Sequence, residues 1–192
     1  MLLRNVWHTD RFRRLDALYR VEDPWGMSGD EEQGRFDETN HLIEKNIGRV
    51  GTLLEVGCGE GHQSSKLLSI CDRLYGLDVS DRAVRRAMNR CPTSTFGVGD
   101  VFSCDFLNDG AVFDLVVACE VLYYVKDVPA TLARLSVLGR WCFVTYYEPR
   151  ATGLDAHLSC VPGVQFGEIG FGATKWKACW WRNDLIRDGM IR

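Results

Sequence analysis

The chain has 192 residues, of which 46% are hydrophobic and 26% charged, and its formal net charge is −3. This length predicts one globular domain with a substantial buried core. A protein dedicated to gripping a nucleic-acid backbone usually carries a basic surplus, so nucleic acid is disfavoured as a partner. The first 20 residues are charged throughout and no long apolar run follows, which predicts neither a signal peptide nor a membrane span.

Eight cysteines are scattered along the chain without any C-x-x-C pair, and no two histidines have metal-ligand spacing. Several of them lie in apolar or glycine-rich segments, where free cysteine behaves as a small hydrophobic residue. We therefore expect reduced thiols, no metal site and a cytoplasmic location.

The N-terminal quarter is predicted to be helical. Apolar residues recur at three- and four-residue spacing over Thr9 to Arg20, and a second helix is expected over Asp30 to Ile47. Between them, Pro24 and Gly26 interrupt any regular structure. We take residues 1–48 as an N-terminal helical segment and 49–192 as the main domain.

From Thr52 onward, short apolar runs alternate with helix-like stretches. Runs with little polar alternation are typical of strands that are buried on both faces of a parallel sheet. After Pro149 the pattern changes to two runs separated by glycines, which indicates an antiparallel hairpin. The fold class is therefore α/β, with a doubly wound, mostly parallel seven-stranded sheet and an antiparallel C-terminal hairpin strand. The expected strands are 52–56, 73–77, 95–98, 113–118, 141–146, 164–169 and 174–181.

The first strand runs directly into a turn with glycines at alternate positions, Gly57, Gly59 and Gly61, and a helix-like stretch follows. This order is typical of a nucleotide-type ligand held between a strand and a helix. Dinucleotide sites place their third glycine one position later, where this chain has His62. A histidine there would crowd the contact between helix and sheet, so a nicotinamide dehydrogenase is a weak alternative.

Acidic residues close the next strands. Asp78 ends the second strand and is expected to accept hydrogen bonds from ribose hydroxyls, although it could instead interact with the dipole of the following helix. Asp100 ends the third strand and could accept from a base amino group, with Val101 and Phe102 packing beside the ring; the alternative is a turn aspartate. Glu120 follows the fourth strand, where a capping or surface role is equally open.

Together, the pattern Glu55-x-Gly57-x-Gly59-x-Gly61, then Asp78, Asp100 and the strand from Phe113, resembles the successive motifs of class I S-adenosylmethionine (SAM)-dependent methyltransferases over residues 50–146. Within that Rossmann-like superfamily, Asp23-Pro24-Trp25 and Glu120-Val121-Leu122-Tyr123-Tyr124 look like the NodS-like N-methyltransferases, which modify a deacetylated amino-sugar oligosaccharide.

The resemblance implies SAM as cofactor, S-adenosylhomocysteine (SAH) as product, and an N-terminal segment that closes over the cofactor as a lid. It places Arg35 near the methionine carboxylate, although a solvated helix charge is an equal alternative. It places Glu120 at the methionine end. The residues expected at the cofactor are Trp25, Arg35, Glu55, Gly57, Cys58, Gly59, Gly61, Asp78, Val79, Asp100, Val101, Phe102 and Glu120.

Catalysis would need mainly alignment of donor and acceptor, with a general base only if the acceptor arrives protonated. Glu120, Tyr124 and His157 are the candidate catalytic residues. Tyrosines 123, 124, 146 and 147 could stack on a sugar, hold a cation or simply pack, whereas Trp176, Trp180 and Trp181 are expected to serve packing. N- and O-transfer to a small molecule both stay open, as do a protein or RNA methyltransferase and a non-catalytic SAM-binding subunit. We expect a monomer or homodimer.

Overall fold

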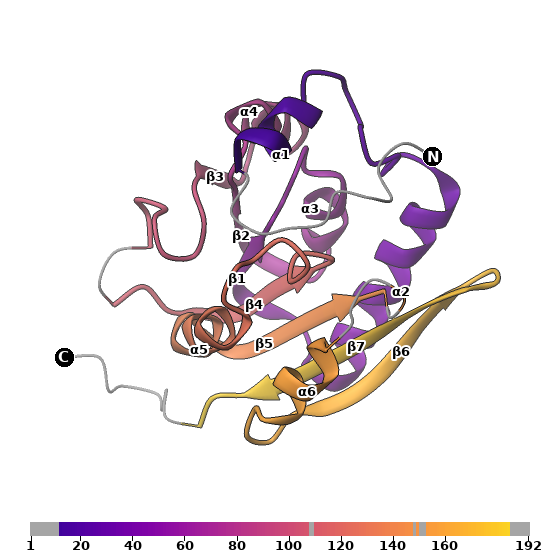
Figure 1. Ribbon diagram of the computed structural model, residues 1–192, viewed down its shortest axis with the longest axis vertical. Coiled ribbons are helices and arrows are strands. Elements are labelled where there is room, and N and C mark those ends of the chain that lie inside the picture. Colours follow the sequence, from indigo (N-terminus) through magenta and orange to yellow (C-terminus); the bar gives the residue numbers. More distant parts are fainter. Residues whose placement is uncertain (1–11, 108–109, 148, 150–152, 185–192) are drawn as a thin grey trace.

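The computed structural model describes residues 12–107, 110–147, 149 and 153–184. Its centre is a seven-stranded sheet with the order β3-β2-β1-β4-β5-β7-β6 (Figure 1). Strands β1 to β5 pair in parallel, and β7 is antiparallel to both β5 and β6. The predicted fold class is confirmed. The strands are β1 (Val50–Val56), β2 (Cys71–Asp78), β3 (Thr95–Val98), β4 (Phe113–Cys119), β5 (Gly139–Tyr146), β6 (Gln165–Phe171) and β7 (Thr174–Arg182).

Helices cover both faces of this sheet (Figure 1). On one face α2 contacts α3 and β6, and α4 contacts α3 and β3; on the other, α5 lies on β4 and β5 and contacts α6. The helices are α1 (Phe12–Leu18), α2 (Asp30–Asn46), α3 (His62–Leu67), α4 (Asp81–Arg90), α5 (Val128–Leu138) and α6 (Leu154–Ser159). No helix within the described part of the chain is both long enough and apolar enough to cross a membrane.

The apolar strands are explained by the two cores that they separate. In β1, Leu53 packs into the cluster under α2 to α4, and its neighbour Leu54 packs into the cluster under α5. Successive side chains of a strand point to opposite faces, so a strand covered on both sides must be apolar at every position. This requirement explains why the central strands could be predicted from the sequence.

Local hydrogen bonds set most of the helix boundaries. The side chain of Ser80 accepts from the Ala83 amide at 3.3 Å and begins α4, as its residue type predicts, and Asp127 caps α5 through the Ala130 amide at 2.9 Å. Helix α3 ends at Leu67, and the amides of Ser69 and Ile70 bond carbonyls three positions back, which tightens the last turn.

The C-terminal hairpin turns more tightly than the sequence suggested. Strands β6 and β7 are joined by Gly172 and Ala173 alone, with Gly172 at φ +59°, because Gly170 and Phe171 still belong to β6. The tip of this hairpin reaches α2: the Phe171 ring packs where a side chain on Gly34 would otherwise be, and Thr174 donates to Glu31.

Candidate active site

A cavity of about 990 Å³ opens at the carboxyl ends of β1, β2 and β4, between the glycine turn and residues 15–36 of the N-terminal segment. Ligands of open α/β sheets bind at this edge, where the strand order reverses. Twelve of the thirteen residues predicted at the cofactor line this cavity, and the thirteenth, Gly61, directly precedes His62 and Gln63, which also line it. The glycines contribute backbone alone to the cavity wall, whereas the other predicted residues contribute charge, hydrogen bonds or apolar surface.

The glycine turn adopts the backbone that its sequence predicts. Gly57, Gly59 and Gly61 have φ values of +75°, +52° and +79°, a region that L side chains rarely adopt. A Cβ atom on Gly57 would also lie 2.4 Å from Val121 Cγ2. Cys58, between the first two glycines, is buried in the wall. The turn therefore needs glycine for both conformation and space, and it leaves the backbone open to a ligand.

Two buried carboxyl groups lie beneath the turn. Asp78 accepts from the Gly59 amide at 3.0 Å and from the Ser80 amide at 2.9 Å, and burial raises its pKa to about 6. Glu55 accepts from the Ser64 hydroxyl, and burial raises its pKa to about 8. Val79 lines the cavity beside Asp78. Asp78 thus holds the second strand end to the glycine turn, and Glu55 lies in the interior as a largely protonated acid at neutral pH.

Arg35 of α2 is buried, with 2% of its side chain exposed. Its Nε donates to Glu32 at 2.7 Å, and its guanidinium carbon lies 5.8 Å from the centre of the Trp176 ring. No described residue partners Arg35 Nη1. This burial excludes the alternative of a solvated helix charge. The unpaired Nη1 is available to donate to an anionic ligand group.

Glu120 also lines the cavity, in a strained backbone position with φ +58°. Tyr123 donates to its Oε2 at 2.8 Å, and Thr145 Oγ1 lies 3.3 Å from its Oε1. Burial raises the pKa of Glu120, while the nearby Arg35 charge opposes that rise. The carboxyl group is thereby fixed in direction at the cavity wall and is not a surface or capping acid.

Aromatic residues also line the cavity. The Trp25 ring lies 5.9 Å from that of Tyr124, and Trp25 Nε1 donates to the Tyr19 hydroxyl at 3.1 Å. Trp176, expected only to pack, lies in the cavity wall together with Tyr147. Tyr146, by contrast, points into the core below α5 and donates to Asp155.

The third strand end contributes a shallower part of the wall. Asp100 Oδ1 accepts from the Phe102 amide at 3.0 Å and from the Ser103 hydroxyl at 2.7 Å, so the aspartate also shapes its own turn. Val101 is buried, whereas Phe102 is 60% exposed at the rim. All three residues line the cavity, as expected for one end of a nucleoside site.

The structure does not bring His157 to the cavity. It lies on the exposed side of α6, and Leu154 and Leu158 lie on the buried side of that helix. Glu148, which follows β5, lies outside the described residues. Some residues of the cavity wall belong to no recognisable sequence motif and were not predicted. One of them is Gln63, whose buried Nε2 has no described partner.

Comparisons with known proteins agree with this arrangement. Residues 10–139, about two thirds of the chain, match the family model for Nodulation protein S (NodS). The chain belongs to the NodS family. Nodulation protein S of Rhizobium tropici is 34% identical over 124 residues, which are 62% of this chain and 50% of that protein. The Sinorhizobium fredii NGR234 protein is 33% identical over 127 residues, 66% of this chain and 58% of its own length. The chain thus spans about half the length of the curated NodS relatives it matches.

Solved structures show the same fold. The N-methyltransferase NodS of Bradyrhizobium japonicum WM9, crystallised with SAH, superposes with a TM-score of 0.75 at 21% identity, over 90% of this chain and 98% of that one. Magnesium protoporphyrin IX methyltransferase from Synechocystis, with bound SAM, gives 0.68 at 17% identity over 92% and 99%. The resemblance to NodS-like methyltransferases is confirmed. The NodS match ends at Gly139, the first residue of β5, and therefore includes the glycine turn and Glu120, but neither His157 nor the hairpin with Trp176.

Proposed function

We propose that this protein is a SAM-dependent methyltransferase that transfers a methyl group to an amine nitrogen of a small acceptor, an amino sugar or a similar natural product. The observation that carries the proposal is one cavity that joins two sets of groups. The glycine turn and Asp78 line this cavity, and so do Glu120 and the aromatic residues Trp25, Tyr124 and Trp176. Membership of the NodS family and the N-methyltransferase activity of its crystallised relative support the nitrogen acceptor.

The residues fit the cofactor. Gly57 and Gly59 have no side chain to obstruct a ligand that approaches the backbone, and Asp78 has the position of a ribose-binding acid. The unpaired Nη1 of buried Arg35 suits the carboxylate of a methionine moiety. SAM supplies, when bound, a methyl group on a positively charged sulfur. Trp25 and Tyr19 would then cover the site and exclude water.

The acceptor end suits a group that is cationic in solution. Glu120 supplies a negative charge, and Tyr124 and Trp25 supply aromatic faces against which a sugar or an ammonium group can pack. Trp176 extends the aromatic wall from the hairpin. An amino sugar combines both features that this wall would recognise.

Glu120 is the group that we assign to proton transfer. An ammonium nitrogen has no lone pair and must lose a proton before it can accept a methyl group. Tyr123 and Thr145 orient the Glu120 carboxylate, and burial raises its pKa, which makes it a better proton acceptor than an exposed glutamate. The proton would be held on a carboxylate oxygen of Glu120, and the remaining residues would align the acceptor.

The first experiment measures thermal unfolding with SAH and, as control, with NADH. A ligand at 100 times its dissociation constant stabilises the native state by about 2.7 kcal/mol. We expect a shift with SAH, none with NADH, and loss of the SAH shift in Asp78→Ala. An Asp78→Ala variant that binds SAH as the wild type does would contradict the assignment of the site.

The second experiment tests turnover by mass spectrometry. Glucosamine oligomers should gain one methyl group in the presence of SAM, and the matched N-acetylated oligomers, which have no free amine, should gain none. Glu120→Gln should lose turnover while it still binds SAH. Methylation of RNA or protein in place of the amine, or SAH binding without turnover on an amine panel, would overturn the proposed acceptor.

The remaining expectations stay predictions of this proposal. Residues 1–48, of which 12–48 are described, would form a helical segment that covers the cofactor, and residues 49–192 would form the methyltransferase domain. A cytoplasmic monomer or homodimer is expected. Size-exclusion chromatography with light scattering checks the oligomeric state.

A further inference from the structure

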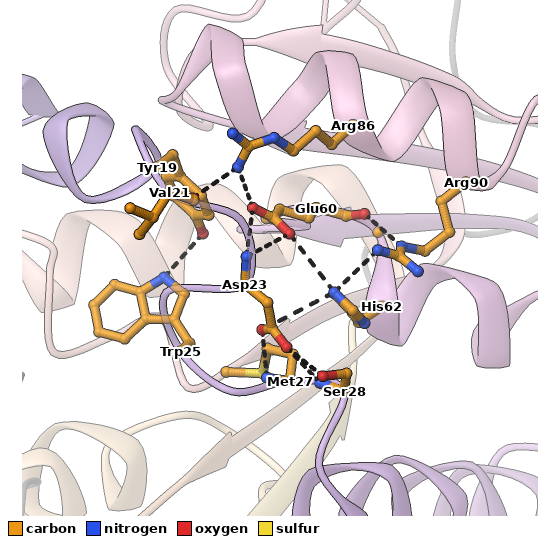
Figure 2. Close-up of polar contacts among 12 residues, drawn as sticks. Tyr19, Val21, Asp23, Trp25, Met27, Ser28, Glu60, His62, Arg86 and Arg90 are labelled. Atoms are coloured by element: carbon orange, nitrogen blue, oxygen red, sulfur yellow. Dashed lines mark hydrogen bonds and ion pairs between the residues drawn. The ribbon is translucent and has the colours of Figure 1, made fainter. Parts of the chain in front are cut away.

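Glu60, between the second and third glycines of the turn, is buried with 4% of its surface exposed, although a turn residue of this type is normally solvated. The backbone N–H of Asp23 donates to both of its carboxylate oxygens, at 3.1 and 3.0 Å, and Arg86 donates to Oε1 (Figure 2). His62 Nε2 lies 3.7 Å from Oε2. A buried charge is tolerated only with such partners, so the Glu60 carboxylate is held in place by these contacts.

Helix α4 completes the network (Figure 2). Arg86 donates to the carbonyl of Val21 at 2.9 Å as well as to Glu60, so one guanidinium joins the turn to the segment that precedes Asp23. Arg90 donates through Nε to the Glu60 carbonyl at 2.9 Å, and its Nη2 lies 3.1 Å from His62 Nε2. The side chain and the backbone of Glu60 are thus both fixed from α4.

The segment held in this way, Val21–Ser28, is hereafter the covering segment. Its internal shape depends on Asp23, whose φ of +45° is unfavourable for a non-glycine residue. The Asp23 carboxylate accepts from the Met27 and Ser28 amides and from the Ser28 hydroxyl, which closes the loop on itself. The covering segment is therefore a preformed loop, and Glu60 fastens it at the residue where its backbone is most strained.

Trp25 lies only two residues after that attachment point. Its indole lines the cavity, bonds Tyr19 and faces Tyr124. Because Glu60 also lies between Gly59 and Gly61, a single side chain ties the floor of the cavity to its cover.

We propose that Glu60 is a positioning residue: paired with Arg86, it fastens the covering segment to the glycine turn and thereby sets the position of Trp25 over the cofactor. The structural part of this inference concerns the free protein, whereas its effect on ligand residence rests on the proposed SAM function.

The test compares Glu60→Gln and Arg86→Met, singly and combined, with a matched pair on the same helix. Asp81 and Arg85 form an exposed ion pair on α4 at 2.7 Å, so Asp81→Asn and Arg85→Met make the same chemical changes away from the covering segment. Hydrogen exchange of the free protein is followed by mass spectrometry in the peptide that contains residues 21–29. SAH association and dissociation rates are measured on the same variants.

We expect Glu60→Gln and Arg86→Met each to accelerate exchange in residues 21–29 about tenfold. The double variant should exchange little faster than Arg86→Met alone, because the Glu60–Arg86 ion pair is already lost in that single variant. SAH should dissociate about tenfold faster from these variants with little change in association. The Asp81 and Arg85 variants should match the wild type in both measurements.

Unchanged exchange in residues 21–29 of both Glu60→Gln and Arg86→Met overturns the inference, as do fully additive effects in the double variant. If Glu60→Gln fails to fold, Arg86→Met carries the same test, because Arg86 is one quarter exposed and its loss leaves the glycine turn intact. A wild-type protein that binds no SAH refutes the proposed function, while the exchange measurement still decides whether Glu60 fastens the covering segment. Faster exchange with unchanged SAH dissociation overturns the role in positioning Trp25.

Discussion

Replacement of Glu55 by glutamine should stabilise the protein, although Glu55 is the acid of the glycine-turn pattern. Its side chain is fully buried below the cavity and accepts from the Ser64 hydroxyl. Burial raises its pKa from 4.5 to about 8, so the native state holds a proton there that the unfolded state has released at neutral pH. Glutamine has nearly the same shape as the protonated acid and carries no proton that must be taken up on folding.

The magnitude follows from the two pKa values. Between 4.5 and about 8 the native state binds more protons at Glu55 than the unfolded state does, so its contribution to stability is complete below pH 4.5 and is lost as the pH rises toward 8. One pKa unit corresponds to about 1.4 kcal/mol. The free energy of unfolding of Glu55→Gln, relative to the wild type, should therefore increase by about 3 kcal/mol from pH 5 to pH 7.5.

Urea denaturation at pH 5, 6.25 and 7.5 measures this difference, provided that the slope of unfolding free energy against urea concentration stays constant. Glu44→Gln, on the exposed side of α2, controls for the loss of a carboxylate, and it should stay within about 0.5 kcal/mol of the wild type throughout. A relative stability of Glu55→Gln that does not change with pH would refute the reasoning, because the glutamate would then be ionised in the native state.

Three further substitutions test other parts of the structure. Gly57→Ala should weaken SAH binding more than tenfold in a titration and lower the melting temperature, because alanine at φ +75° is strained by about 1 to 2 kcal/mol and its Cβ meets Val121. Gly34→Ala should lower the free energy of unfolding measured in urea, because its Cβ would lie 2.2 Å from the Phe171 ring. Alanine is favoured over glycine in a helix by about 1 kcal/mol, so the stability should rise again when Phe171→Ala removes the clash. His157→Ala should retain the wild-type rate of methyl transfer, since His157 does not line the cavity; a large loss of rate would place the acceptor near α6.

The C-terminal hairpin contributes one side of the cavity. Trp176 of β7 lies against Arg35 of α2, and Thr174 donates to Glu31 of the same helix. The contact between Phe171 and Gly34 holds the tip of the hairpin against that helix. One side of the cavity therefore depends on a close approach between segments more than 130 residues apart in the chain.

From the sequence alone, the glycine turn, the mostly parallel sheet and the start of α4 after Ser80 could be predicted. These features depend on local chemistry: glycine alone accepts the positive φ values, strands covered on both faces must be apolar, and serine caps a helix through its own hydroxyl. The position of Asp78 and Asp100 at the cavity could be predicted because Asp78 ends β2, Asp100 lies two residues after β3, and the ends of parallel strands meet at one edge.

The roles of residues whose partners are distant in the chain became clear from the folded structure alone. Arg35 reads equally well as a solvated charge until α2 is buried against the hairpin. Glu60 reads as a solvated turn residue until the Asp23 amide, 37 positions earlier, is placed on its carboxylate. His157 was a reasonable base until α6 turned it away from the cavity. No periodicity or spacing encodes such contacts, because burial and hydrogen-bond partners across the fold arise only when the separate elements pack together.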